Sequence, residues 1–190
     1  MSQNRKFAIF VSGYGRTALQ ILNMHYSNIL NADIGAVIST YENSEAIKFA
    51  KHIGIPTRVI KLNEFKNRTY FENEILQYLS QERIENVFLA GFKYLLTINY
   101  LSKFTGYTLN IHPSLLPSFK GNSGIQMALD YGVKVTGLTI HQINESMDEG
   151  EILMQKCIKI EIDDDFESLD KKFQDAAPDL IKDCLNTYFK

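Results

Sequence analysis

The chain has only two cysteines, no long apolar run and almost no net charge. Cys157 and Cys184 lie far apart without the spacing of metal ligands, so we expect two reduced thiols and no metal site. The net charge of −2 and the pI near 6.1 give no overall basic surface for nucleic acid. Apolar runs fall short of the roughly 20 residues that span a bilayer, and the N-terminal run ends in a glycine turn, unlike a signal peptide. We expect a cytoplasmic protein that binds neither nucleic acid nor membranes.

The sequence also has no internal repeat, no low-complexity tract and no linker. Its 190 residues, 45% of them hydrophobic, suit one globular domain with an ample core. A charged content of 22% is ordinary for a folded protein. We therefore predict a single domain over residues 1–190.

Through the first 112 residues, apolar runs of strand length alternate with stretches of helical period. Strands are expected at 6–12, 34–39, 57–62, 86–91 and 107–112. Helices are expected between them, at 17–30, 44–53, 67–83 and 93–103. This alternation, with near-continuous apolar strands, predicts an α/β protein with a Rossmann-like, mostly parallel twisted sheet flanked by helices.

The pattern changes after residue 122. A helix is expected at 124–131, followed by two strands, 133–143 and 151–160, joined by a turn. A closing helix is expected at 165–189, interrupted at Pro178 because proline removes a helical hydrogen bond. The acidic run 163–165 is interpreted as a solvated loop and helix start.

A glycine-rich loop follows the first expected strand. The stretch Gly13-Tyr14-Gly15-Arg16-Thr17-Ala18 fits G-x-G-x-x-[GA], in which small residues let backbone amides approach a phosphate at a helix N-terminus. Arg16 or Thr17 can add a charged or hydroxyl contact. The alternative is a tight turn with no ligand. The motif alone does not separate NAD, with Glu42 as the ribose acid, from another phosphorylated ligand, but no P-loop sequence of an NTP hydrolase occurs.

A second polar cluster follows the fifth expected strand, in "LNIHPSLLPSFKG". Asn110 and His112 lie two residues apart, so their side chains share one face near the carboxyl end of that strand, where α/β proteins bind ligands. Asp148 lies in the turn "NESMDEGE" and would meet His112 if that turn folds back. An amide donor, a titratable imidazole and a carboxylate suit a reaction through a tetrahedral oxyanion. No Ser or Cys nucleophile is evident, which favours direct transfer.

The alternative for this cluster is a structural histidine beside an ordinary Asp-x-Gly turn. The other three histidines, His25, His52 and His141, are expected to lie on helix surfaces or to pack on strands, and we assign them no role.

The stretch "LNIHPSLLPSFKG", followed by "YGVKVTGLTIHQINESMDEGEILMQ", resembles the folate-dependent formyltransferase family. Members share Asn-x-His-Pro-Ser-Leu-Leu-Pro and an Asp-x-Gly turn about 35 residues later, and 36 positions separate His112 from Asp148 here. The resemblance covers nearly the whole chain and is strongest to the purine-synthesis branch, whose members are free-standing domains of this length. It implies formyl transfer from 10-formyltetrahydrofolate to the amine of glycinamide ribonucleotide. An amino-sugar nucleotide or another small amine is the alternative acceptor.

The resemblance also implies roles for individual residues. Asn110 and a protonated His112 would stabilise the oxyanion, while Asp148 would orient His112 and help relay the proton. The folate pocket would involve Tyr94, Leu95, Leu96, Asn144 and Met147. The phosphorylated acceptor would contact Gly13, Gly15, Arg16, Thr17, Arg68 and Asp175. The phosphate-binding half would then cover about 1–100 and the catalytic and folate half about 101–190, in a monomer or homodimer.

Three departures from the purine-synthesis branch concern the acceptor rather than the formyl chemistry. The loop reads "GYGRTAL" where that branch has Gly-x-Gly-Ser/Thr-Asn, Ile125 stands where it has a histidine, and Tyr94 stands where the family often has an arginine. Two other classes stay open: an NAD-dependent oxidoreductase, and a non-catalytic protein that binds a nucleotide or folate.

Overall fold

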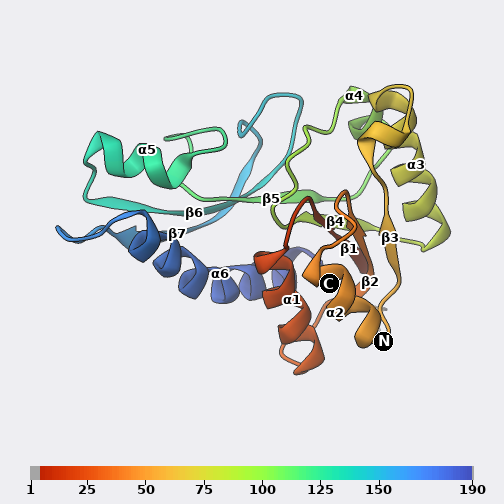
Figure 1. The fold of residues 1–190 in the computed structure, drawn as a ribbon, viewed down its shortest axis with the longest axis horizontal. Helices are drawn as coiled ribbons and strands as arrows, with labels where there is room; N and C mark the ends of the chain where they lie inside the picture. The colour runs from red at the N-terminus through yellow and green to blue at the C-terminus, as the bar shows by residue number, and fades with distance from the viewer. Residues whose placement is uncertain (1–4, 190) are drawn as a thin grey trace. The chain divides into compact units, whose positions relative to one another are not determined.

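The computed structural model describes residues 5–189, which divide into two compact units. The first contains the chain up to Thr108 together with its last residues from Leu185, and the second is Leu109–Cys184. Figure 1 traces the elements of both in chain order, from red to blue.

The first unit is built on four parallel strands with the neighbour order β3-β2-β1-β4. Their bounds are β1 Lys6–Val11, β2 Asp33–Ser39, β3 Thr57–Val59 and β4 Asn86–Leu89. Every residue of β1 from Phe7 to Val11 is buried, and so is every residue of β4. This near-continuous burial is what parallel strands covered on both faces require.

Helices connect the strands of the first unit. Their bounds are α1 Arg16–Tyr26, α2 Glu45–His52, the 3₁₀ helix η1 Leu62–Glu64, α3 Arg68–Gln81 and α4 Ile98–Leu101. The side chain of Asn67 caps α3 by accepting a hydrogen bond from the Tyr70 N–H. Phe71, Ile75 and Leu79 follow at helical spacing and are buried.

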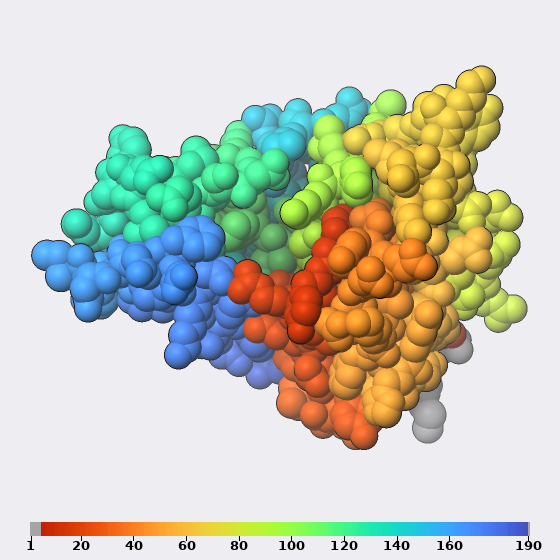
Figure 2. Space-filling view, viewed as in Figure 1, coloured from red at the N-terminus to blue at the C-terminus, as the bar shows by residue number. Residues whose placement is uncertain are grey.

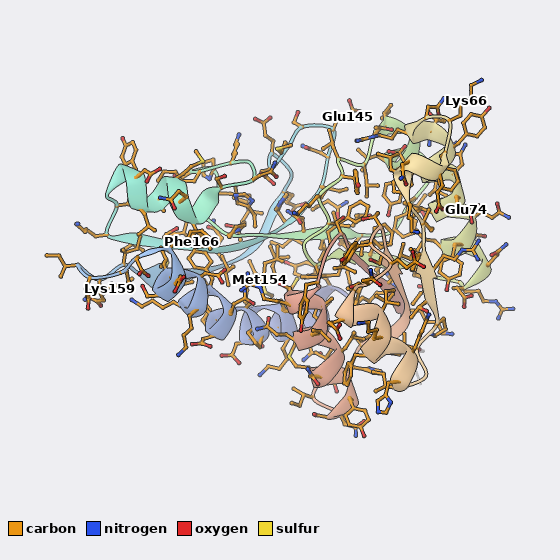
Figure 3. All side chains as sticks on the ribbon, in the orientation of Figure 1. Lys66, Glu74, Glu145, Met154, Lys159 and Phe166 are labelled. Carbon is orange, nitrogen blue, oxygen red and sulfur yellow. The ribbon has the colours of Figure 1, made fainter. Side chains whose placement is uncertain are left out.

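The second unit contains an antiparallel meander. Its elements are β5 Thr108–His112 (from Leu109 on), α5 Gly124–Tyr131, β6 Val135–Gln142, β7 Ile152–Lys159 and most of α6, Phe166–Tyr188. β6 pairs antiparallel with both β5 and β7. Figure 3 labels Met154 and Lys159 on β7 and Phe166 at the first turn of α6.

Two predictions about helices are wrong. The helix expected at 93–103 is only Ile98–Leu101, because the Glu72 carboxylate accepts hydrogen bonds from the N–H and hydroxyl of Thr97 and the helix begins after that residue. Pro178 does not interrupt the closing helix, which continues from Phe166 to Tyr188. The buried residues of this helix keep their helical spacing on both sides of the proline, and the free energy gained by burying them outweighs the loss of one hydrogen bond. These residues are Phe173, Ala177, Leu180, Ile181, Cys184 and Leu185.

Smaller differences concern element ends. The third strand stops at Val59 rather than 62, and the first helix stops at Tyr26 rather than 30.

Within residues 5–189, no helix combines the length and apolarity that crossing a bilayer requires. Figure 2 shows the green-blue surface of α5 facing the viewer. Tyr131, the last residue of α5, is 80% exposed.

Candidate active site

The strand β5 positions Asn110 and His112. Its antiparallel register with β6 sets His141 opposite Asn110 and Thr139 opposite His112. The Asn110 Nδ2 lies 3.2 Å from the His141 Nε2, and both histidines are almost fully buried. The sheet register therefore creates a compact polar group inside the second unit.

Asp148 completes this group from the turn between β6 and β7, where its φ of 56° gives a sharp left-handed bend. Its Oδ2 accepts a hydrogen bond from the Gly121 N–H at 2.8 Å and lies 3.4 Å from the His112 Nδ1. Its Oδ1 lies 3.5 Å from the His141 Nε2. The turn folds back toward β5 as expected, and one carboxylate faces two imidazoles.

The segment after β5 encloses the other side of His112. The His112 Nε2 lies 2.9 Å from the carbonyl of Phe119, so the Nε2–H donates to it. The Phe119 ring packs edge-on against Tyr131, with centroids 5.9 Å apart. Lys120 and Glu149 form an exposed ion pair at 2.7 Å, which joins this segment to the Asp148 turn a second time.

Thr139, also buried, fixes the start of the same segment. Its Oγ1 accepts the Leu116 N–H at 3.0 Å and donates to the Ser114 carbonyl at 2.7 Å. The loop after His112 is thus held by the neighbouring strand rather than by proline stiffness alone.

Burial and charge set the protonation of this group. Burial lowers the pKa of His112, against the opposing effects of the Phe119 carbonyl and the Asp148 carboxylate. Burial would raise the pKa of Asp148, but hydrogen bonds from His141 and the Gly121 N–H, and the nearby imidazoles, keep it below its usual value. The free protein at neutral pH therefore favours an ionised Asp148 beside a neutral His112. The family resemblance implies a protonated His112 in the reaction, whereas burial favours the neutral form in the free protein.

His141 is the functional candidate that sequence reasoning missed. It was expected to pack on a strand without a role, yet it lies within reach of both Asn110 and Asp148. Its Nδ1 is 3.2 Å from the Gln142 carbonyl, which holds the ring in place. The sequence indicates only that His141 lies on a strand that follows the Asn-x-His motif. The register that brings it opposite Asn110 cannot be predicted from a single sequence.

The glycine loop lies in the first unit. Gly15 has φ +91° and immediately precedes α1, while the Ser44 hydroxyl donates to the Tyr14 carbonyl at 3.2 Å and holds the loop. The first N–H groups of a helix have no intrahelical partner, so this terminus suits an anion. Gly13, Arg16 and Thr17 adjoin it in sequence. Glu42 forms an exposed ion pair with Lys61 at 2.7 Å, which leaves the ribose-acid interpretation without support.

Arg68, which is predicted to contact the acceptor, bonds to the predicted folate segment in this structure. Its Nη1 donates to the Leu95 carbonyl at 2.5 Å. The ring of Tyr94 packs against Phe92 and Phe71, at centroid distances of 5.7 and 6.0 Å. Leu95 is exposed and Leu96 is buried, so Leu95 is the more accessible of the two to a ligand.

The remaining candidates lie on other elements of the second unit. Asn144 accepts the Ser146 N–H at 2.9 Å within the β6–β7 turn, and Met147 is exposed beside Asp148. Asp175 lies on the exposed side of α6. Ile125, the departure in α5, is buried. Among residues 5–189, no three His, Cys, Asp or Glu side chains are grouped as metal ligands.

Comparison with known proteins assigns the chain to a family. The family model described as "Formyl transferase" matches residues 5–185. Phosphoribosylglycinamide formyltransferase of Bacillus subtilis (strain 168) is 31% identical over 185 residues, with 95% of each chain covered. The trifunctional purine biosynthetic protein adenosine-3 of Gallus gallus is 36% identical over 90% of this chain, which spans only 17% of that longer relative.

Solved structures agree. Glycinamide ribonucleotide transformylase 1 from Geobacillus kaustophilus matches with a TM-score of 0.94 and 29% identity, covering 99% of this chain and 100% of that one. Phosphoribosylglycinamide formyltransferase from Bacillus halodurans matches with a TM-score of 0.89 and 32% identity, covering 98% and 100%. The predicted α/β formyltransferase fold is confirmed, and the chain belongs to the formyl transferase family.

Proposed function

We propose that this protein transfers the formyl group of 10-formyltetrahydrofolate to the amine of glycinamide ribonucleotide, a step of purine biosynthesis. The observation that supports it most is the buried group in which Asp148 faces His112 at 3.4 Å with Asn110 on the same strand. The full-length relatives named for this activity support the choice of acceptor. The alternative of an NAD-dependent oxidoreductase would use Glu42 to bind a ribose, but Glu42 pairs with Lys61, which does not support that role.

The donor set of the site fits this chemistry. Bound 10-formyltetrahydrofolate supplies the carbonyl carbon that the acceptor amine attacks. The Asn110 amide and the His112 imidazole provide the hydrogen-bond donors that a developing oxyanion needs. The Nε2–H of His112 is held by the Phe119 carbonyl, so it exchanges that bond when it donates to a substrate oxygen.

Proton transfer follows from the protonation states. The attacking amine becomes acidic as its bond forms, and Asp148 relays its proton to the His112 Nδ1, the ring nitrogen that carries no hydrogen. Ionised Asp148, 3.4 Å from Nδ1, stabilises the resulting imidazolium. His141 and the Gly121 N–H hold the carboxylate in place. The bond between the formyl carbon and the folate nitrogen then breaks, and the imidazolium returns the proton to that nitrogen as tetrahydrofolate leaves, so no covalent enzyme intermediate is required.

Binding roles outside this group are part of the proposal. The helix terminus after Gly15, with Gly13, Arg16 and Thr17, receives the acceptor phosphate. The folate contacts are the backbone of 94–96 together with Asn144 and Met147, and Asp175 remains a candidate for the acceptor. Arg68 also remains a candidate for the acceptor, and its bond to Leu95 joins it to the folate segment.

We extend the proposal to the setting of the reaction. The small phosphorylated amine is the partner, and a net charge of −2 fits a protein that binds neither nucleic acid nor membranes. We place the reaction in the cytoplasm, carried out by a monomer or homodimer of one formyltransferase domain. Sedimentation at working concentration measures the assembly.

The test is a turnover assay with 10-formyltetrahydrofolate, followed by the change in folate absorbance on loss of the formyl group. Glycinamide ribonucleotide is offered in one arm and amino-sugar nucleotides in another. Turnover only with amino sugars would replace the proposed acceptor, and turnover with neither would end the proposal. His112→Asn should lower turnover by about 10²–10³-fold, while the matched control His52→Asn, at an exposed position on α2, should leave it unchanged.

A further inference from the structure

Helix α3 buries a carboxylate that the proposed chemistry does not use. Glu72 is 0% exposed, and a buried carboxylate is costly unless hydrogen bonds compensate for lost water. Its Oε1 accepts the Thr97 N–H at 2.7 Å, and its Oε2 accepts the Thr97 hydroxyl at 2.7 Å and the Asn99 Nδ2 at 3.1 Å. All three donors belong to the short segment 97–99, which directly follows the proposed folate contacts.

Arg68 acts on the same segment from one helical turn earlier. Residues four apart share a face of a helix, so Arg68 and Glu72 both reach the segment from α3. Arg68 donates to the Leu95 carbonyl, two residues before the Thr97 N–H that Glu72 accepts. The Arg68 guanidinium thus donates to a backbone carbonyl of this segment, and the Glu72 carboxylate accepts from a backbone N–H of the same segment.

Two further contacts hold the ends of this stretch. On one side the Tyr94 ring packs against Phe71, which also belongs to α3. On the other, the Lys103 Nζ donates to Asn99 Oδ1 at 2.7 Å and to Asn73 Oδ1 at 2.9 Å. The path of residues 94–97, which have no secondary structure of their own, is therefore set largely by side chains of α3, and residues 98–99 begin α4.

We propose that Glu72 is a positioning residue for the formyl donor: by fixing the Thr97 end of this segment, it presents the backbone of 94–96 to the pterin. The inference rests on the proposed function, since it takes 94–96 as folate contacts. A carboxylate suits the role because both of its oxygens accept. A glutamine would present an N–H₂ group to one of the three donors and lose that bond.

The test separates donor binding from the rest of the reaction. Glu72→Gln should raise the KM for 10-formyltetrahydrofolate by about tenfold to a hundredfold, the range of a lost hydrogen bond to a charged group. The kcat and the KM for glycinamide ribonucleotide should stay within about twofold, because the His112 group is untouched. The matched control is Glu74→Gln on the same helix, which removes only an exposed pair with Arg58 and should change neither KM.

A second pair of variants keeps the test decisive if Glu72→Gln does not fold. Thr97→Val removes the hydroxyl donor at nearly constant volume and should raise the folate KM, while Thr97→Ser keeps the hydroxyl and should restore it. An unchanged folate KM in Thr97→Val or Glu72→Gln, or an equal change in both KM values and kcat, would overturn the positioning role. A wild-type protein without turnover would instead remove the proposed function, and the inference with it.

Discussion

Replacing Gly15 by alanine should destabilise the first unit at the start of α1. Gly15 has φ +91°, a left-handed conformation that costs a residue with a Cβ about 1–2 kcal/mol. The added Cβ would lie 2.7 Å from the Ala46 Cβ and 3.2 Å from the Val11 Cγ2, both of which belong to buried residues. Overpacking of this kind costs about 1–3 kcal/mol. We expect a total loss of about 2–5 kcal/mol in the free energy of unfolding.

Urea unfolding followed by circular dichroism measures this loss, and two other glycines separate its two causes. Gly54→Ala tests the backbone cost alone, because Gly54 has φ +81° and no atom within 4 Å of a built Cβ. Gly13→Ala tests neither, because its Cβ meets nothing within 4 Å and its φ is outside the left-handed region. The expected order of loss is Gly15, then Gly54, then Gly13. A Gly15→Ala protein no less stable than Gly54→Ala would refute the packing argument, and one as stable as Gly13→Ala would refute both.

Four further predictions concern the proposed catalytic group and the phosphate loop. Asp148→Asn should fold, because asparagine tolerates the φ of 56°, yet lose about 10²–10⁴-fold in kcat/KM; activity within threefold of the wild type would remove Asp148 from the mechanism. The acid limb of kcat/KM against pH should lie below 6.5, the ordinary pKa of histidine, because burial lowers the pKa of His112, and a limb above that value would contradict neutral His112 as the proton acceptor. As the pH falls, His112 takes up its proton in the unfolded chain before it does so in the folded protein. Its contribution to stability is therefore present above pH 6.5 and is lost as the pH falls through the folded pKa, which urea unfolding at a series of pH values would show. Arg16→Ala should raise the KM for the phosphorylated acceptor about tenfold or more with the folate KM unchanged, and equal kinetics would move the phosphate elsewhere.

The sequence predicted the fold well where local pattern decides it. The alternation of apolar strands and helices up to His112 reflects burial on both faces, and each expected strand is present. The approach of Asp148 to His112 was also predictable, since a glycine-containing turn between two strands folds back on its neighbours. Pro178 was misjudged because its local cost is visible in the sequence, whereas the buried stripe on both sides of it depends on tertiary packing.

Contacts between side chains on different elements could not be predicted from the sequence. His141 joins the proposed site through antiparallel register, and a shift of one residue would have turned it to the other face. Glu72 looks like any surface glutamate of an amphipathic helix until its three donors are seen. The bond from Arg68 to Leu95 was likewise not predictable, because it depends on how the chain returns to α3.

The edge-on contact between Phe119 and Tyr131 offers an optical reporter of the proposed active site. The chain contains no tryptophan, so a single indole would emit without background from a second one. Tyr131 is 80% exposed, which gives a larger ring room in its place, and its neighbour Phe119 provides the carbonyl that holds His112. Emission from Tyr131→Trp would therefore follow Phe119 as that carbonyl releases the imidazole to a substrate, in real time and without any label attached to the folate or the acceptor.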